Sequence, residues 1–188
     1  MLDQFEMRAG DMPSEMQSLL RTYPRDTWEA HPGFKEKTRH LLGAHRMFRQ
    51  LSASVRKDTE SYLNGDKDAQ DYAGRLSYRG GALVGNLHCH HGWEDHSYFP
   101  ELSAADPRFN VGLAVLEKDH ADLDVVLDSF TRTANRTIKL IQLNETAAQE
   151  EAGKLHGVAL TIEAFLQRHL TDEEELAVPI ILHHRLRG

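Results

Sequence analysis

Apolar residues recur at alternating spacings of three and four along most of the chain after residue 34, a pattern typical of helices that bury one face. Turn-forming clusters at 64–66, at 100–110 and at roughly 134–145 divide this region into four segments. The β-branched residues are scattered among strong helix formers, so no alternating strand pattern competes with this interpretation. We therefore predict an all-α fold in which four helices form an up-down-up-down bundle.

The N-terminal region has a different pattern. Prolines and glycines punctuate residues 1–32, and one short helix fits between Pro13 and Tyr23. We expect residues 1–32 to form an N-terminal arm and residues 33–188 to form the bundle.

Each apolar stripe contains one histidine, and two of the stripes also contain a glutamate one turn later. The stripes comprise Leu41, His45, Phe48, Ser52 and Val55; Leu76, Gly80, Leu83, Leu87, His90 and Glu94; Leu113, Leu116, His120, Leu123, Leu127 and Phe130; and Leu155, Ala159, Ile162, Leu166, His169 and Glu173. Residues spaced in this way face the core of a bundle. Four imidazoles and two carboxylates in one core would leave many polar atoms without partners, unless something polar binds among them. The stripes therefore predict a metal centre.

The predicted ligands form an internal repeat. Each half has a lone histidine, followed 45 or 49 residues later by the pattern His-x3-Glu-x5-Pro. These residues are His45, His90, Glu94 and Pro100 in one half, and His120, His169, Glu173 and Pro179 in the other. Because residues i and i+4 lie one above the other on a helix, each His/Glu pair reaches one site from one direction. Two equivalent half-sites predict two metal ions bridged by the two glutamates, and each proline is expected to end or bend its helix.

Composition limits the chemistry of this centre. The chain has 188 residues, of which twelve are histidine and one, Cys89, is cysteine, so imidazole and carboxylate must hold any metal. The net charge of −7 argues against a nucleic-acid partner, and no apolar run approaches the length of a membrane span. The acidic N-terminus lacks the positive charge of a secretory signal, so we expect a cytoplasmic protein.

The order of a lone His, His-x3-Glu, a second lone His and a second His-x3-Glu resembles the hemerythrin-like, or HHE cation-binding, family. The resemblance spans residues 34 to 182 and is strongest in His-His-Gly-Trp-Glu-Asp-His-Ser-Tyr-Phe-Pro at 90–100 and His-Leu-Thr-Asp-Glu-Glu-Glu-Leu-Ala-Val-Pro at 169–179. It implies two non-haem iron ions with an oxo or hydroxo bridge, which bind or react with dioxygen, peroxide or nitric oxide. The implied ligands are His45, His90, Glu94, His120, His169 and Glu173, with the glutamates bridging.

The chain also departs from the pattern of oxygen-carrying hemerythrins. Those proteins have a second histidine where this chain has Asp124. They also place the last carboxylate at the position of Glu174, so Glu174 is an alternative to Glu173 as the ligand. The irons would then keep open positions, which Asp124, Glu174, His91 or a tyrosine would complete. The candidate tyrosines are Tyr62, Tyr72 and Tyr78.

A second His/acid pair, His91 with Asp95, competes with His90 and Glu94. Only the register that begins at His90 repeats the distance to proline, so we predict that His91 and His88 are partners of ligands or surface groups.

Three functions are compatible with these residues. The first is a di-iron protein that carries or turns over a small oxidant; no side chain is placed as a dedicated general acid or base, so any catalysis would be the metal's own. The second is an iron- or oxygen-responsive sensor, in which the state of the iron alters the docking of residues 1–32. The third is a structural zinc-binding bundle, because imidazole also suits zinc. No particular oligomeric state is predicted.

Overall fold

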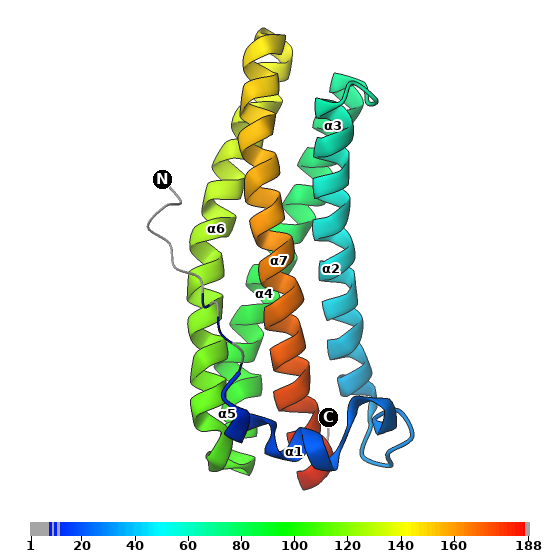
Figure 1. Ribbon diagram of the computed structural model, residues 1–188, viewed down its shortest axis with the longest axis vertical. Coiled ribbons are helices and arrows are strands. Elements are labelled where there is room, and N and C mark those ends of the chain that lie inside the picture. The colour runs from blue at the N-terminus through cyan, green and yellow to red at the C-terminus, as the bar shows by residue number, and fades with distance from the viewer. Residues whose placement is uncertain (1–7, 9, 11, 187–188) are drawn as a thin grey trace. The chain divides into compact units, whose positions relative to one another are not determined.

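The computed structural model describes residues 8, 10 and 12–186, which fold into helices and turns without a strand. Three long helices are α2 (Glu36–Leu63), α6 (Asn110–Leu143) and α7 (Glu145–His184) (Figure 1). The stretch between α2 and α6 contains α3 (Ala69–Arg75), the π-helical turn η3 (Leu76–Gly80), α4 (Gly81–Trp93), the π-helical turn η4 (Glu94–Tyr98), α5 (Phe99–Ala105) and the short 3-10 helix η5 (Pro107–Phe109). The prediction of an all-α fold is confirmed.

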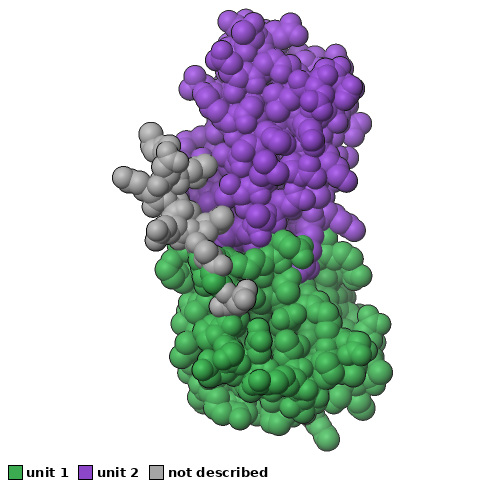
Figure 2. Space-filling model, in the orientation of Figure 1, with its two compact units in different colours: residues 1–46, 91–122, 167–188 green, residues 47–90, 123–166 purple. Residues whose placement is uncertain are grey.

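The chain divides into two compact units, which are coloured separately in Figure 2. Unit 1 contains residues 1–46, 91–122 and 167–188, and unit 2 contains residues 47–90 and 123–166. In each unit, four helical segments that alternate in direction pack around an apolar core (Figure 1). All residues of the predicted stripes are buried except His90, which is half-buried. The 3/4 spacing therefore identified the inward faces correctly.

The N-terminal helices η1 (Ser14–Gln17), α1 (Ser18–Thr22) and η2 (Arg25–Thr27) belong to unit 1. Met16 and Leu19 join the apolar cluster of this unit that includes Leu113 and Leu176. A Cβ atom at Gly112 would lie 2.9 Å from Leu176 Cδ2 and 3.1 Å from Met16 Sδ, so a larger residue would push these side chains apart. The short helix expected between Pro13 and Tyr23 is thus present and packed.

Two of the three predicted turns are shorter than expected. The turn at 64–66 is present, with Gly65 at a φ of 78°. By contrast, α5 continues to Ala105, because Pro100 lies in its first turn, where a missing N–H breaks no helical hydrogen bond. Helix α6 runs to Leu143, and only Asn144 separates it from α7, whose Ala147 N–H donates to Asn144 Oδ1 at 3.0 Å.

Pro179 also does not end its helix, since α7 continues to His184. Among the described residues, no helix combines the length and the apolar character that a membrane span needs.

Candidate metal centre

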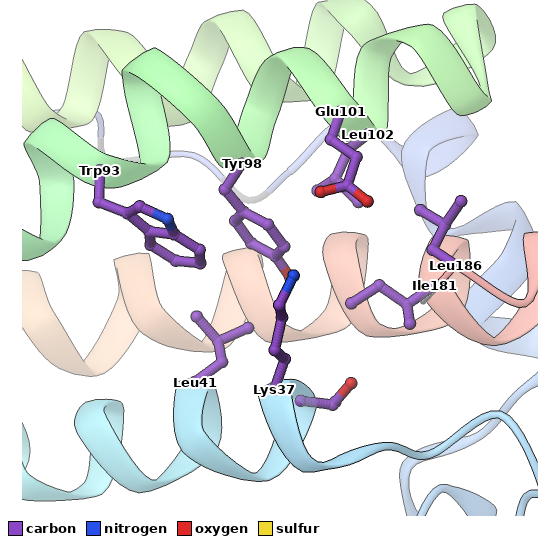
Figure 3. A pocket seen from close by; sticks show the side chains of 9 residues that line it. Lys37, Leu41, Trp93, Tyr98, Glu101, Leu102, Ile181 and Leu186 are labelled. Carbon is purple, nitrogen blue, oxygen red and sulfur yellow. The ribbon is translucent and has the colours of Figure 1, made fainter. Parts of the chain in front are cut away.

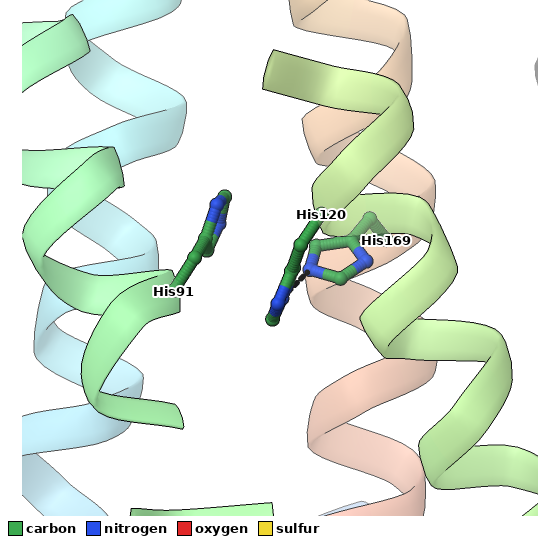
Figure 4. Close-up of side chains that lie close together, drawn as sticks. All are labelled: His91, His120 and His169. Atoms are coloured by element: carbon green, nitrogen blue, oxygen red, sulfur yellow. Dashed lines mark hydrogen bonds between the residues drawn. The ribbon is translucent and has the colours of Figure 1, made fainter. Parts of the chain in front are cut away.

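Three buried histidines of unit 1 gather into one group (Figure 4). His91, from α4, His120, from α6, and His169, from α7, bring ligand nitrogens within 4.8 Å of one another. The Nε2 atoms of His120 and His169 are 3.2 Å apart, and the rings of His91 and His120 stack with centroids 4.0 Å apart. All three imidazoles are buried, so the group is a candidate cation site made of nitrogen donors.

A second group in unit 1 combines His45 with the glutamates Glu94 and Glu173, again with ligand atoms within 4.8 Å. His45 Nε2 lies 3.3 Å from Glu173 Oε2 and 3.9 Å from Glu94 Oε1, and all three side chains are fully buried. His90 is the last residue of unit 2 and precedes Glu94 by one turn along the same helical stretch.

Glu94 faces both groups through its two carboxylate oxygens. Its Oε1 atom is the oxygen 3.9 Å from His45 Nε2, and its Oε2 atom is 3.6 Å from His120 Nε2. Glu94 therefore offers one carboxylate oxygen to each of the two donor groups.

The position of His91 excludes one of the two alternatives predicted for it. His91 is 4% exposed and stacks on His120, so it is not a surface group. The reason is helical geometry: counted from buried Leu87, His90, His91 and Glu94 stand at i+3, i+4 and i+7, so both histidines flank the inward face. The choice between the registers of His90 and His91 was therefore unnecessary, since α4 turns both toward the interior.

Carboxylates hold the far side of three of the histidine rings. Asp95 Oδ1 lies 2.7 Å from His120 Nδ1, Glu174 Oε1 lies 3.0 Å from His45 Nδ1, and Asp119 Oδ2 lies 3.4 Å from His169 Nδ1. Such contacts orient an imidazole and direct its Nε2 atom toward a metal.

Two of these contacts follow the internal repeat. Asp95 comes directly after Glu94 and bonds the lone histidine of the other half, and Glu174 comes directly after Glu173 and does the same. The sequence carried this signal as an acid after each bridging candidate, but the interpretation of Glu174 as a replacement for Glu173 hid it. Glu174 contacts Nδ1 of His45 and Glu173 faces Nε2, so the two acids have different positions.

Neighbouring charged groups shift the pKa of two residues here, His45 and Asp119. Burial by itself lowers the pKa of His45, but the charge of Glu173 and hydrogen bonds with Glu173, Glu174 and Glu94 raise it well above its usual value. Burial by itself raises the pKa of Asp119, but hydrogen bonds with His169 and Arg8 and the nearby charges lower it to about 2. Asp119 is therefore an anion at neutral pH.

The other candidate ligands lie in different surroundings. Asp124 is exposed and pairs with His88 at 3.2 Å. Tyr62 and Tyr72 stack on each other with centroids 4.5 Å apart, and Tyr78 is 79% exposed.

The tyrosine that the sequence interpretation missed is Tyr98, one turn after Glu94 in unit 1. Burial, followed by the charges of Glu173 and Glu94, raises its pKa well above the usual value, so it is a neutral phenol.

Tyr98 also lines a cavity of about 30 Å³ in unit 1 (Figure 3). Its other walls are mainly apolar and include Leu41, Trp93 and Ile181. Two buried hydroxyls, Tyr98 OH and Thr38 Oγ1, line it and have no hydrogen-bond partner within the described part of the chain. A volume of this size holds one or two water-sized molecules.

The helical segments enclose two groups of imidazole and carboxylate donors, and further carboxylates orient three of the histidine rings. These features define a candidate cation-binding helical protein. Comparison with protein families agrees: residues 36–181 match the hemerythrin HHE cation binding domain, and the chain belongs to this family. No curated protein and no solved structure gives a significant match. The resemblance seen in the repeat is thus confirmed at the level of the family.

Proposed function

We propose that the chain is a non-haem di-iron protein that binds or reacts with a small oxidant, namely dioxygen, peroxide or nitric oxide. The observation that carries the proposal is the position of Glu94, with one carboxylate oxygen toward each of two donor groups. The donors are nitrogen and oxygen atoms, which suit iron, and the cysteine of the chain, Cys89, is exposed.

Each ion has its own histidines in this proposal. His45 and His90 would hold one ion, His120 and His169 would hold the other, and Glu94 and Glu173 would supply carboxylate oxygens to both. His90 is included because it shares one helical turn with Glu94. The buried group around His120 adds His91 to the six ligands that the sequence predicts.

The cavity beside Tyr98 is the proposed access route for the oxidant. Its small volume excludes bulky substrates, and its apolar walls admit a small molecule of low charge. Bound iron would supply the redox chemistry. The chain would orient the ligands through Asp95, Glu174 and Asp119, and its buried apolar residues would limit the access of water.

Elemental analysis of the full chain, purified without added metal, tests this proposal. We expect about two iron ions per chain, and an absorption spectrum that changes on addition of peroxide. Colourless protein that carries one zinc ion would overturn the proposal and favour a structural zinc bundle. His90→Ala should lower the iron content, whereas His88→Ala, on the same helix but paired with exposed Asp124, should not.

A sensor is the second candidate, and one contact favours it: Arg25 of the N-terminal segment bonds Glu174, which bonds His45. In a sensor, the state of the metal would alter the docking of this segment. Hydrogen exchange of residues 13–30 with and without iron separates the two candidates. Equal protection in both states would exclude the sensor and leave the oxidant-binding function in place.

A further inference from the structure

Arg25 contacts a carboxylate that in turn holds a candidate ligand. Its NH1 atom donates to Glu174 Oε2 at 2.6 Å, and the other oxygen of the same carboxylate, Oε1, lies 3.0 Å from His45 Nδ1. Glu174 is 3% exposed and Arg25 is 47% exposed, so the contact runs from the surface to the buried imidazole. One carboxylate thus fixes a histidine on one side and is itself fixed on the other.

Arg8 makes a second contact of the same kind. Its NH2 atom donates to Asp119 Oδ2 at 3.0 Å, and this oxygen lies 3.4 Å from His169 Nδ1. Arg8 also pairs with Asp172, and Arg168 NH2 lies 3.2 Å from Asp119 Oδ1. The two N-terminal arginines therefore reach one histidine in each of the two donor groups.

Burial explains why these acids need arginines. A carboxylate buried as deeply as Glu174 or Asp119 keeps its charge only beside a cation or several donors. Asp95 provides an internal comparison: it holds His120 in the same way, but its side chain is 35% exposed, and in the described residues no arginine pairs with it. Of the three carboxylates that hold histidine rings, the two buried ones, Glu174 and Asp119, each pair with an N-terminal arginine. The third, Asp95, is partly exposed to water instead.

We propose that Arg25 and Arg8 are positioning residues of the metal centre, so that the docked N-terminal segment sets how firmly the centre retains its metal. Each arginine holds an anionic carboxylate in place, and each carboxylate keeps its imidazole with Nε2 toward the metal. The proposal rests on metal binding at this centre. It assigns to the N-terminal segment a role in tuning the ligands, in addition to its packing on the apolar core of unit 1.

The test uses the full chain loaded with iron and compares Arg25→Gln with Arg25→Lys and Arg21→Gln. Arg21 is an exposed arginine of α1, so its variant makes the same charge change in the same segment. We expect Arg25→Gln to bind as much iron as the wild type but to release it to excess chelator about 3- to 10-fold faster, a smaller effect than loss of the orienting carboxylate itself, because Arg25 is partly exposed and contacts the histidine only through Glu174. Arg25→Lys should restore part of the retention, and Arg21→Gln should match the wild type. Release from Arg25→Gln within twofold of Arg21→Gln would overturn the proposal.

A further readout separates positioning from simple docking. A purely structural salt bridge would lower the melting temperature equally with and without metal. Loss of positioning should lower the melting temperature of Arg25→Gln more in the metal-loaded chain, because weaker metal binding stabilises the folded state less. Arg8→Gln acts on the other donor group, and its effect on release should add to that of Arg25→Gln.

The outcome also distinguishes this proposal from the proposed function. If the purified chain holds zinc, the di-iron proposal fails, and the same release assay with zinc still tests the arginines. If it holds two irons that all variants release at one rate, the di-iron proposal stands and the role of the arginines is refuted.

Discussion

Replacing Glu174 by glutamine should weaken metal binding through His45, without removing any proposed ligand. Glu174 Oε1 is 3.0 Å from His45 Nδ1, and its side chain is 3% exposed, so water does not replace the lost carboxylate. Removing a carboxylate that orients a ligand histidine costs about 10- to 100-fold in metal affinity, or about 1.4–2.7 kcal/mol. Glu174→Gln should fall at the upper end of this range. Asp95→Asn should fall at the lower end, because the Asp95 side chain is 35% exposed and water already weakens the effect of its charge.

Competition with a chelator of known affinity measures the effect on the full chain. Glu175→Gln is the matched control, because it makes the same chemical change at the next residue. The Glu175 carboxylate is 29% exposed and lies 3.8 Å from Arg25. The control should bind metal within about threefold of the wild type, which is under 1 kcal/mol. Equal losses in Glu174→Gln and Glu175→Gln would refute the reasoning, since general charge and not orientation would then explain both.

Three other predictions test separate parts of the structure. His91→Ala should reduce iron from about two ions per chain to one by elemental analysis, because His91 belongs to the buried three-histidine group; unchanged iron would show that His91 is not a ligand. Leu41→Trp should fill the cavity of about 30 Å³ and slow the spectral change with peroxide in stopped-flow mixing at unchanged iron content, and an unchanged rate would exclude this access route. Hydrogen bonds from Arg108, followed by the bond to His184, hold the pKa of Asp106 well below its usual range. Its stabilisation is therefore present above about pH 4 and lost as the pH falls further, so denaturant unfolding of Asp106→Asn should depend less on pH below 4 than that of the wild type.

Much of the fold was predictable, because apolar spacing reports directly on which side of a helix is buried. The stripe through Leu113, Leu116 and Leu123 is buried as expected. The helix ends were less predictable, since tertiary packing extends α6 to Leu143 through a polar stretch in which Ala134 is buried. The π-helical turns η3 and η4 were not predicted, because the stripe from Leu76 to Glu94 keeps the 4/3 spacing of a regular α-helix.

Residues of the candidate centre that lie on an apolar stripe were predictable. Residues that lie off the stripes and orient a histidine were less so. His45 and Glu173 are buried in the predicted places. Asp119 was missed, because its carboxylate holds the outer nitrogen of His169 from a neighbouring helix, and linear spacing does not report on contacts between helices.

The central claim is that two irons share one centre with nitrogen and oxygen ligands. X-ray absorption on the iron-loaded full chain measures this directly, through the scattering of the atoms around each iron. We predict nitrogen and oxygen neighbours without sulfur, and a second iron within about 4 Å. An iron with no iron neighbour, or with a sulfur neighbour, would contradict the account.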